Sequence, residues 1–223
     1  MTKATTSIKA YKGIGMEGFL AKWYATNTGK GMEDFRALAQ RVSEELAPAS
    51  KVLEIAPGPG YFSIELAKRG AFPITGLDIS RTFVELARAR AAQERVSVDF
   101  RQGNASAMPF ADGTFDYTLC RAAFKNFSEP VKAIEEMYRV LKPGGRAVII
   151  DLKKDASVKE INAYIDAAGV GWFNAWIMKV TFRGMLLKRA YTRAQFDEMI
   201  SRTRFRNVSV VTSGIGFEIT LTK

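Results

Sequence analysis

The residues whose types and spacing could do chemistry gather at positions 52–61, where the sequence is VLEIAPGPGY. Its apolar start predicts a buried strand that carries Glu54 near its end. Gly58 and Gly60 follow closely, so the backbone could turn tightly and bring its amides near a ligand with no Cβ in the way. The next apolar run ends at Asp78, whose carboxylate could accept hydrogen bonds from both hydroxyls of a ribose. The pattern predicts a nucleotide site on a strand, a turn and a helix start.

The glycines alone do not separate this site from a dinucleotide site. The dinucleotide fingerprint has a third small residue three positions after the second glycine, which allows close packing of helix on strand. Ser63 stands there and is small enough to be tolerated. Binding of NAD or FAD therefore stays open on this segment alone.

Further motifs follow in order along the chain: TGLDIS at 75–80, GNASAMPF at 103–110, FDYTLC at 115–120 and LKPGG at 141–145. Together with the first segment they resemble the class I S-adenosylmethionine-dependent methyltransferases, especially the ubiquinone and menaquinone biosynthesis C-methyltransferase branch, over residues 48–152. The resemblance implies an α/β fold with a Rossmann-like, doubly wound, seven-stranded sheet, mostly parallel with a C-terminal antiparallel hairpin. It also implies S-adenosyl-L-methionine as cofactor, S-adenosyl-L-homocysteine as product and a small-molecule acceptor.

The resemblance assigns the cofactor to the ends of the predicted strands. Glu54 would complement its ammonium group, Asp78 its ribose, and Asn104 the exocyclic amine of adenine. Each has a structural alternative: Glu54 could cap the loop, Asp78 the next helix, and Asn104 could form a turn, although Ser80 is better placed to cap that helix. The predicted cofactor-binding residues are Glu54, Ala56, Pro57, Gly58, Gly60, Asp78, Ile79, Asn104, Ala105, Cys120 and Arg121.

Two of these residues depart from the family pattern. Ala56 stands where many relatives have glycine, which narrows the backbone angles available to the turn. Asn104 stands where aspartate is common, but its amide oxygen keeps an acceptor. Pro57 and Pro59 stiffen the loop further.

Cys120 and Arg121 end the fourth predicted strand, at the edge where open parallel sheets bind ligands. We expect Cys120 to be a buried apolar side chain rather than a nucleophile, because the chain has no histidine to activate it. Arg121 could bind a substrate anion or pair with a carboxylate. Phe124 and Asn126 resemble the family position that shapes the space around the methyl group, although asparagine is also a common loop residue there. Lys125, between them, is expected to face outwards.

The N-terminal flank, residues 16–46, predicts one or two helices with a break at 29–31. By resemblance these helices fold over the cofactor as a lid, where Trp23 could stack on a planar substrate. The alternative for Trp23 is a buried helical stripe that it shares with Phe19 and Leu20. Tyr24 and Tyr11 are the N-terminal candidates for a base, and each is weak because an unperturbed phenol has a pKa near 10.

The second flank predicts about three helices over 156–203, and its part at 171–189 is amphipathic and basic. Trp172 and Trp176 lie there and are predicted to contact the substrate. Three interpretations stay open: a roof over the substrate pocket, a membrane-surface helix that delivers a quinone-like lipid, and core or dimer packing. The predicted catalytic residues are Tyr24, Phe124 and Asn126, and the predicted substrate-binding residues are Trp23, Trp172 and Trp176.

Apolar and helical patterns alternate through the middle of the chain, as in a parallel sheet. The predicted strands are 51–55, 73–78, 96–101, 115–120 and 146–151, followed by a hairpin at 206–212 and 215–222, and the predicted helices are 60–70, 80–94 and 129–141. We expect one methyltransferase domain over 1–223, with a helical lid at 1–47, a cofactor-binding core at 48–152, a helical cap at 153–203 and a closing hairpin at 204–223.

Composition narrows the chemistry. The 223 residues include one cysteine and no histidine, so no internal disulfide or thiolate metal cluster is expected, and no metal. No long apolar stretch or secretory leader is evident, which favours the cytoplasm. The net charge of +10 could serve solubility, nucleic acid, anionic lipid or acidic small molecules.

The resemblance implies methyl transfer to a small, aromatic molecule, and together with the missing histidine it favours carbon slightly over nitrogen or oxygen as the atom that is methylated. An electron-rich ring attacks through carbon without a strong base at the attacking atom, which suits a chain that lacks histidine. RNA methylation is the weaker enzymatic alternative, because the fourth-strand segment lacks the Asn/Asp-Pro-Pro-aromatic run of base methylation. A cofactor-binding scaffold without turnover is the non-enzymatic alternative, and homodimerisation and peripheral membrane contact stay open.

Overall fold

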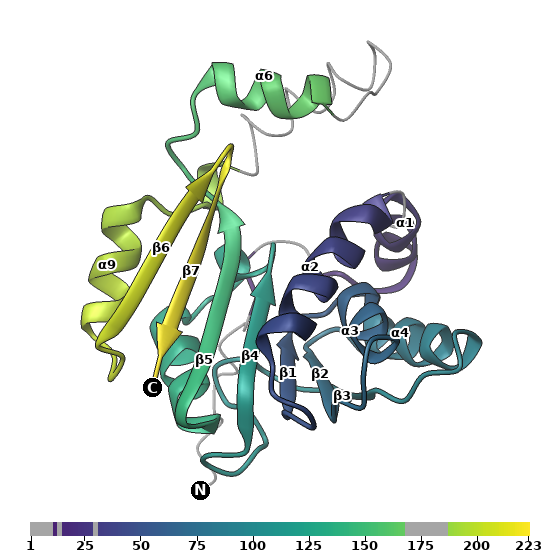
Figure 1. Ribbon diagram of the computed structural model, residues 1–223. Helices are drawn as coiled ribbons and strands as arrows, with labels where there is room; N and C mark the ends of the chain where they lie inside the picture. The colour runs from purple at the N-terminus through teal and green to yellow at the C-terminus, as the bar shows by residue number, and fades with distance from the viewer. Residues whose placement is uncertain (1–10, 13–14, 29–30, 168–186) are drawn as a thin grey trace, which may run out of the picture.

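The computed structural model describes residues 11–12, 15–28, 31–167 and 187–223. In these residues one seven-stranded sheet has the order β3-β2-β1-β4-β5-β7-β6. Strands β1 to β5 pair in parallel, and β7 is antiparallel to both of its neighbours. The strands are β1 (Val52–Ile55), β2 (Ile74–Asp78), β3 (Asp99–Gln102), β4 (Phe115–Arg121), β5 (Leu141–Leu152), β6 (Asn207–Ser213) and β7 (Gly216–Thr222). The predicted fold class is confirmed (Figure 1).

Helices cover both faces of the sheet, and the central strands β1 and β4 are accordingly buried on both faces. The helical elements are α1 (Gly18–Thr28), α2 (Met32–Glu45), α3 (Tyr61–Ala67), α4 (Arg81–Gln93), the 3₁₀ helix η2 (Phe124–Asn126), α5 (Pro130–Val140), α6 (Val158–Ala167), α8 (Leu187–Arg189) and α9 (Arg193–Ser201). Successive residues of a strand point to opposite faces. Val52 accordingly packs in a cluster with residues of α2 and α3, whereas Leu53 packs with residues of α5 and α9.

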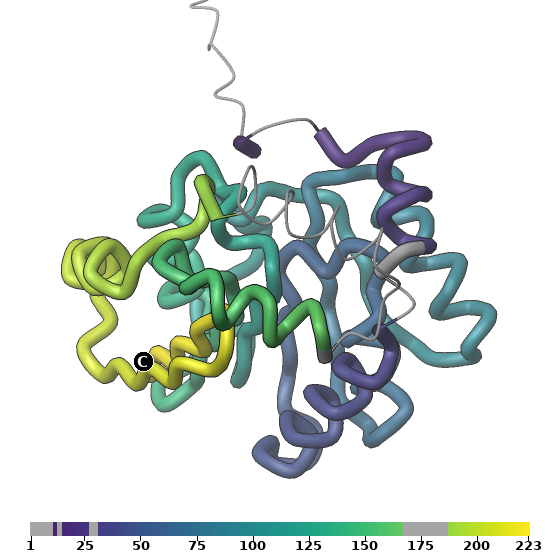
Figure 2. The backbone as a smooth tube through the Cα atoms, turned by 90° about the horizontal axis from the view of Figure 1, so that it is seen from above, coloured from purple at the N-terminus to yellow at the C-terminus, as the bar shows by residue number. Residues whose placement is uncertain are grey.

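The carboxyl ends of the parallel strands form the edge that concerns function. Figure 2 looks down on this edge, with α1 in purple and α6 in green lying over parts of it. Side chains and turns that follow β1, β2 and β4 therefore come together there. No helix in the described part of the chain is both long and apolar enough to cross a membrane.

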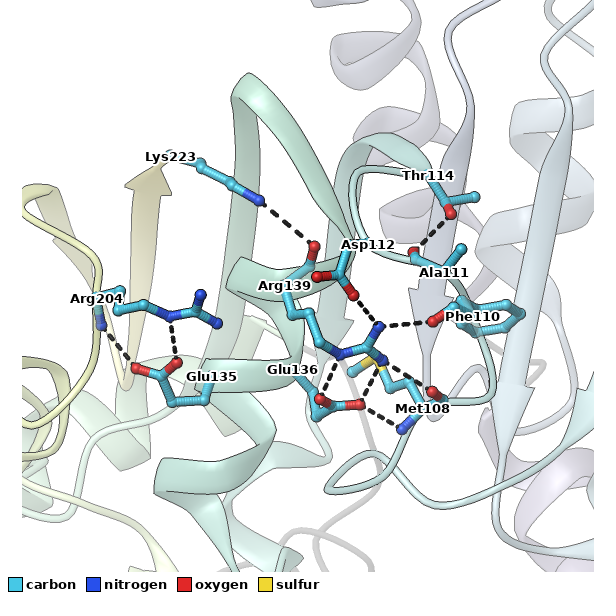
Figure 3. Close-up of polar contacts among 10 residues, drawn as sticks. All are labelled: Met108, Phe110, Ala111, Asp112, Thr114, Glu135, Glu136, Arg139, Arg204 and Lys223. Atoms are coloured by element: carbon cyan, nitrogen blue, oxygen red, sulfur yellow. Dashed lines mark hydrogen bonds and ion pairs between the residues drawn. The ribbon is translucent and has the colours of Figure 1, made fainter.

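Arg139 of α5 anchors the loop between β3 and β4, which carries Asn104 and Ala105. Its guanidinium donates to the carbonyls of Met108 and Phe110 at 2.9 and 2.7 Å and to the carboxylate of Asp112 at 2.8 Å (Figure 3). Hydrogen bonds to a charged donor are stronger than neutral ones. The loop is thus fixed from behind, on the side of the sheet that α5 covers.

Most predicted elements are confirmed, with two corrections. Strand β5 begins at Leu141 rather than at 146, because Leu141 already pairs with Phe115 of β4. The register then shifts, and regular pairing continues from Arg146 opposite Tyr117. The alternative of a buried stripe on α1 is wrong for two of its members, because Phe19 and Trp23 are 83% and 55% exposed; the buried residues among those described at 18–26 are Ala21 and Ala25. The small side chains of Ala21 and Ala25 face the rest of the protein, whereas Phe19 and Trp23 lie on the exposed side of α1.

Candidate functional site

Glu54 is the buried acid at the end of β1. The residue is only 3% exposed. Its carboxylate accepts hydrogen bonds from the Ser63 amide at 3.1 Å and from the Ser63 hydroxyl at 2.5 Å. Burial raises the pKa of Glu54 to about 7, and the two bonds from Ser63 and the charge of Arg121 oppose that rise. Glu54 therefore ties the strand to the first turn of α3 and gains from any cation placed beside it.

Asp78 is the second buried acid and ends β2. Its two oxygens accept from the Gly58 amide and the Ser80 amide, each at 2.9 Å. Burial raises the pKa of Asp78 to about 6, and the bonds from Ser80 and Gly58 lower it. Ser80, as predicted, caps α4 by accepting from the Phe83 amide at 3.1 Å. Asp78 is thus shared between the turn after β1 and the start of α4.

The turn between β1 and α3 uses left-handed backbone at three positions. Ala56, Gly58 and Gly60 have φ values of 55°, 55° and 79°. A Cβ on Gly60 would lie 2.6 Å from Phe100 and 2.9 Å from Ala87, so packing requires this glycine. A Cβ on Gly58 would meet no atom within 4 Å. Gly58 therefore leaves open space beside Asp78, where a ligand could approach the backbone.

These residues suit the cofactor that the sequence predicts. Two buried carboxylates with raised pKa values would be stabilised in their charged form by a ligand that carries an ammonium and a sulfonium group. Ile79, directly after Asp78, is 40% exposed and gives an apolar surface at the same edge. Pro57 is buried beneath the turn, and its ring lies near Gly76 of β2. The fit is one of charge, shape and position; contact with the cofactor stays a prediction for each residue.

Asn104 occupies a turn after β3. Its amide oxygen accepts from the Ser106 amide at 2.9 Å, so the structural alternative for this residue is present. Ala105 packs partly buried against the main core cluster. The predicted bonds to adenine would require the second lone pair of the Asn104 oxygen or the adjacent backbone.

The end of β4 carries Cys120 and Arg121. Cys120 is fully buried, which confirms the expectation of a buried side chain, and burial raises the pKa of its thiol. The Arg121 guanidinium lies 4.3 Å from the ring centroid of Phe35 and 4.0 Å from the carboxylate of Asp34. Arg121 thus contacts α2, which favours the carboxylate-pairing alternative in this structure.

Lys125 does not face outwards, and that prediction is wrong. Its ammonium donates to Asp151 of β5 at 2.8 Å and to the Ala122 carbonyl at 2.5 Å, and its own amide donates to Asp151 at 2.9 Å. An isolated buried charge is costly, so each partner requires the other. The ion pair joins the loop after β4 to the end of β5. In the sequence, the acidic residue Asp151 at the end of the predicted strand 146–151 was the feature that could have indicated a buried partner for Lys125.

Phe124 and Asn126 are the sequence neighbours of Lys125. Phe124 is fully buried and stacks on Phe196 of α9 at a centroid distance of 5.3 Å. It therefore supports the loop from the core, and its predicted contact with substrate stays untested. Asn126 is partly buried, and its carbonyl accepts from the Lys12 amide at 2.7 Å.

The segment around α1 is hydrogen-bonded to the starts of α3 and α4. The Tyr61 hydroxyl donates to the Ala25 carbonyl at 2.6 Å, and the Ser80 hydroxyl donates to the Met16 carbonyl at 2.5 Å. The Glu17 carboxylate accepts from the first two amides of α4 at 3.0 and 3.1 Å. The sequence did not predict these bonds, which place the segment around α1 beside Asp78.

Tyr24 is the one predicted catalytic residue on α1. Its ring packs edge-on against Phe83 of α4, with centroids 5.8 Å apart. Trp23 stands on the exposed side of the same helix. Trp172 and Trp176 lie outside the described residues. In the described residues no group of three or more histidine, cysteine or acidic side chains could hold a metal ion.

Known proteins resemble the middle of the chain. Residues 53–149 match the family model described as a methyltransferase domain. A demethylmenaquinone methyltransferase of Deinococcus radiodurans is 38% identical over 108 residues, which are 48% of this chain and 45% of the relative. A ubiquinone/menaquinone biosynthesis C-methyltransferase of a Ruegeria species is 36% identical over 110 residues, 48% of this chain and 44% of the relative. The chain spans about half the length of the curated relatives it matches.

A solved structure extends the likeness to the flanks. A Methanococcus maripaludis protein assigned to the S-adenosyl-L-methionine-dependent methyltransferases has a TM-score of 0.72, with 21% identity and 95% coverage of both chains. At this identity the likeness shows the fold alone. The family match at 53–149 includes Glu54 and Asp78 and leaves out α1, α6 and α9.

Proposed function

We propose that the chain, whose residues 53–149 match the methyltransferase-domain model, is a class I S-adenosylmethionine-dependent methyltransferase that transfers a methyl group from S-adenosylmethionine to a carbon atom of a small aromatic molecule. An electron-rich quinol is the acceptor we favour. The curated relatives that support this choice are named for demethylmenaquinone methylation and for C-methylation in ubiquinone and menaquinone biosynthesis.

The observation that carries the proposal is the pair of buried acids on neighbouring strands. Glu54 and Asp78 stand on either side of the Gly58 turn, and both are 5% exposed or less. When bound, the cofactor supplies an electrophilic methyl group on a sulfonium. Glu54 would bind its ammonium group and Asp78 its ribose hydroxyls, while Asn104 would face the adenine. The chain thereby contributes position and charge rather than a strong base.

The acceptor would lie beyond the end of β4, where η2 and the N-terminal segment meet. Methyl transfer from a sulfonium is an in-line displacement, so it depends on holding the reacting atoms about 3 to 3.5 Å apart. The Lys125–Asp151 pair holds the loop that would form one wall of this space. The helix α1 and the predicted helical cap at 153–203 would exclude water from this space.

Transfer of a labelled methyl group tests the proposal. Wild-type protein is incubated with methyl-labelled S-adenosylmethionine and a panel of quinols, phenols and indoles, and products are separated and located by mass. We expect a label on a ring carbon of at least one quinol or phenol, and its loss in Asp78→Asn. Failure to label any member of the panel, with the cofactor bound, would count against turnover and favour a scaffold role.

Two accompanying proposals concern partners. If the acceptor is a lipid quinol, the basic segment 171–189 is our candidate for peripheral membrane contact, and co-sedimentation with anionic vesicles tests it. Homodimerisation is tested by sedimentation equilibrium. Neither relative named above supports RNA as the acceptor.

A further inference from the structure

The described N-terminal residues 11–12 lie against the loop that follows β4. Tyr11 forms an antiparallel backbone bridge with Phe127, and the Lys12 amide donates to the Asn126 carbonyl at 2.7 Å. These contacts join positions more than one hundred residues apart in the sequence. They place Tyr11 beside the loop where the acceptor is expected.

A third segment meets the other two there. The Lys12 carbonyl accepts from the Arg189 guanidinium of α8 at 3.3 Å, and the Lys12 ammonium donates to the Tyr191 hydroxyl at 2.7 Å. Figure 2 shows residues 11–12 as the short purple piece close to the light green start of the region after 187. Arg189 thus stands on the same side of the site as Tyr11.

The surroundings of the Tyr11 phenol link it to the cofactor side. Burial raises its pKa, the charge of Arg189 lowers it, and Tyr24 and Asp78 raise it further. These influences agree with the backbone contacts, which bring residues 11–12 both to the loop after β4 and to the Arg189 guanidinium.

We propose that Tyr11 and Arg189 form the recognition pair for the acceptor and bind an ionisable oxygen, that of a phenol or an enol, next to the carbon that receives the methyl group. This inference rests on the methyl transfer proposed above and narrows the class of acceptor.

The chemistry of the two side chains supports this class. Arg189 supplies a permanent charge with N–H donors in one plane, and Tyr11 supplies a hydroxyl donor. Both are partly buried, which strengthens their hydrogen bonds to an anion. The acceptor's hydroxyl proton leaves to solvent. The ring carbon then bonds to the methyl carbon as the carbon–sulfur bond breaks, and the ring proton leaves to water, so no oxidant or reductant is required.

A matched pair of probes tests recognition without turnover. Protein saturated with S-adenosylhomocysteine is titrated at pH 8 with 2-naphthol and with 2-methoxynaphthalene, which differ only in the ionisable oxygen. We expect wild type to bind 2-naphthol about tenfold more tightly or better, as one charged hydrogen bond provides. Tyr11→Phe and Arg189→Gln should each reduce that preference to about threefold or less, with unchanged affinity for S-adenosylhomocysteine.

Tyr138→Phe and Arg204→Gln are the matched controls, because Arg204, in the segment before β6, lies 4.4 Å from the ring of Tyr138 on α5, and within the described residues neither forms a hydrogen bond or ring contact with residues 11–12 or Arg189. Both controls should keep the wild-type preference. Equal affinity for the two probes, no binding of either, or a preference that survives both site variants would overturn the recognition pair. Labelled phenols or quinols in the transfer assay would leave the proposed function standing in that case, whereas failure of S-adenosylhomocysteine to bind would remove the function itself.

Discussion

The ammonium of Lys125 lies 2.8 Å from a carboxylate oxygen of Asp151, and both side chains are 6% exposed or less. The pair joins the loop after β4 to the end of β5, next to the space proposed for the acceptor. Removing one partner leaves a buried charge uncompensated, which costs more than the pair contributes.

Lys125→Met should therefore lower the free energy of unfolding by about 3 to 5 kcal/mol, measured by urea denaturation. Lys125→Met combined with Asp151→Asn should recover part of the loss, because the amide stays able to accept from the Lys125 backbone. Lys132→Met, which removes an exposed ion pair with Glu129, should change stability by about 1 kcal/mol or less. Equal effects of the Lys125 and Lys132 variants would show that burial does not matter here.

Glu54 and Asp78 should make the protein without ligand less stable as the pH rises. Their pKa values are raised to about 7 and about 6 in the folded state, so the folded protein binds these protons more tightly than the unfolded chain. The stability they contribute is complete below about pH 4 and is lost as the pH rises through about 7. For Glu54 alone the change is roughly 3 kcal/mol.

Urea denaturation from pH 5 to pH 8 measures this effect by comparing wild type with Glu54→Gln. The comparison is needed because Glu17 and Glu136 have lowered pKa values and act in the opposite direction. Glu54→Gln should lose less stability than wild type between pH 5 and pH 8. Parallel curves for the two proteins would show that Glu54 is ionised throughout.

Ala56 and Ala89 provide a matched pair of alanine-to-glycine changes. Ala56 has a φ of 55°, where a Cβ costs roughly 1 to 2 kcal/mol, so Ala56→Gly should leave stability unchanged or raise it by up to about 1 kcal/mol. Ala89 is exposed within α4, and Ala89→Gly should lower stability by about 1 kcal/mol. Thermal denaturation distinguishes the two signs, and a loss at Ala56 as large as at Ala89 would rule out strain at the turn.

Gly58 and Gly60 should respond differently to alanine. Gly60→Ala places a Cβ 2.6 Å from Phe100, so it should destabilise the fold by several kcal/mol. Gly58→Ala meets no neighbour, so its cost is backbone strain of roughly 1 to 2 kcal/mol. It should still weaken binding of S-adenosylhomocysteine about tenfold or more, because its methyl group enters the proposed ligand space. Unchanged affinity in a folded Gly58→Ala protein would place the ligand elsewhere.

Local patterns were enough to predict the central strands and the two acids that they carry. Apolar runs that end at Asp78 and Arg121 predict strands that leave polar groups at the carboxyl edge, and β2 and β4 follow that pattern. The capping role of Ser80 was equally local, since it depends on the helix that follows directly.

The remaining features depend on contacts between distant positions. Lys125 is buried only because Asp151 arrives from β5, 26 residues later. Residues 11–12 acquire their place through Phe127 and Arg189, which belong to two other segments. Helical periodicity also misplaced Phe19, because packing of α1 uses its small residues instead. Patterns within one segment carry no information about such partners.

Calorimetric titration with S-adenosylhomocysteine tests the central claim, that the edge between Glu54 and Asp78 holds the methyl donor. We predict one binding site per chain in wild type and an affinity about tenfold lower or worse in Asp78→Asn, which keeps the size of the side chain but loses its charge. No binding by wild type, or the same affinity in both proteins, would contradict the account.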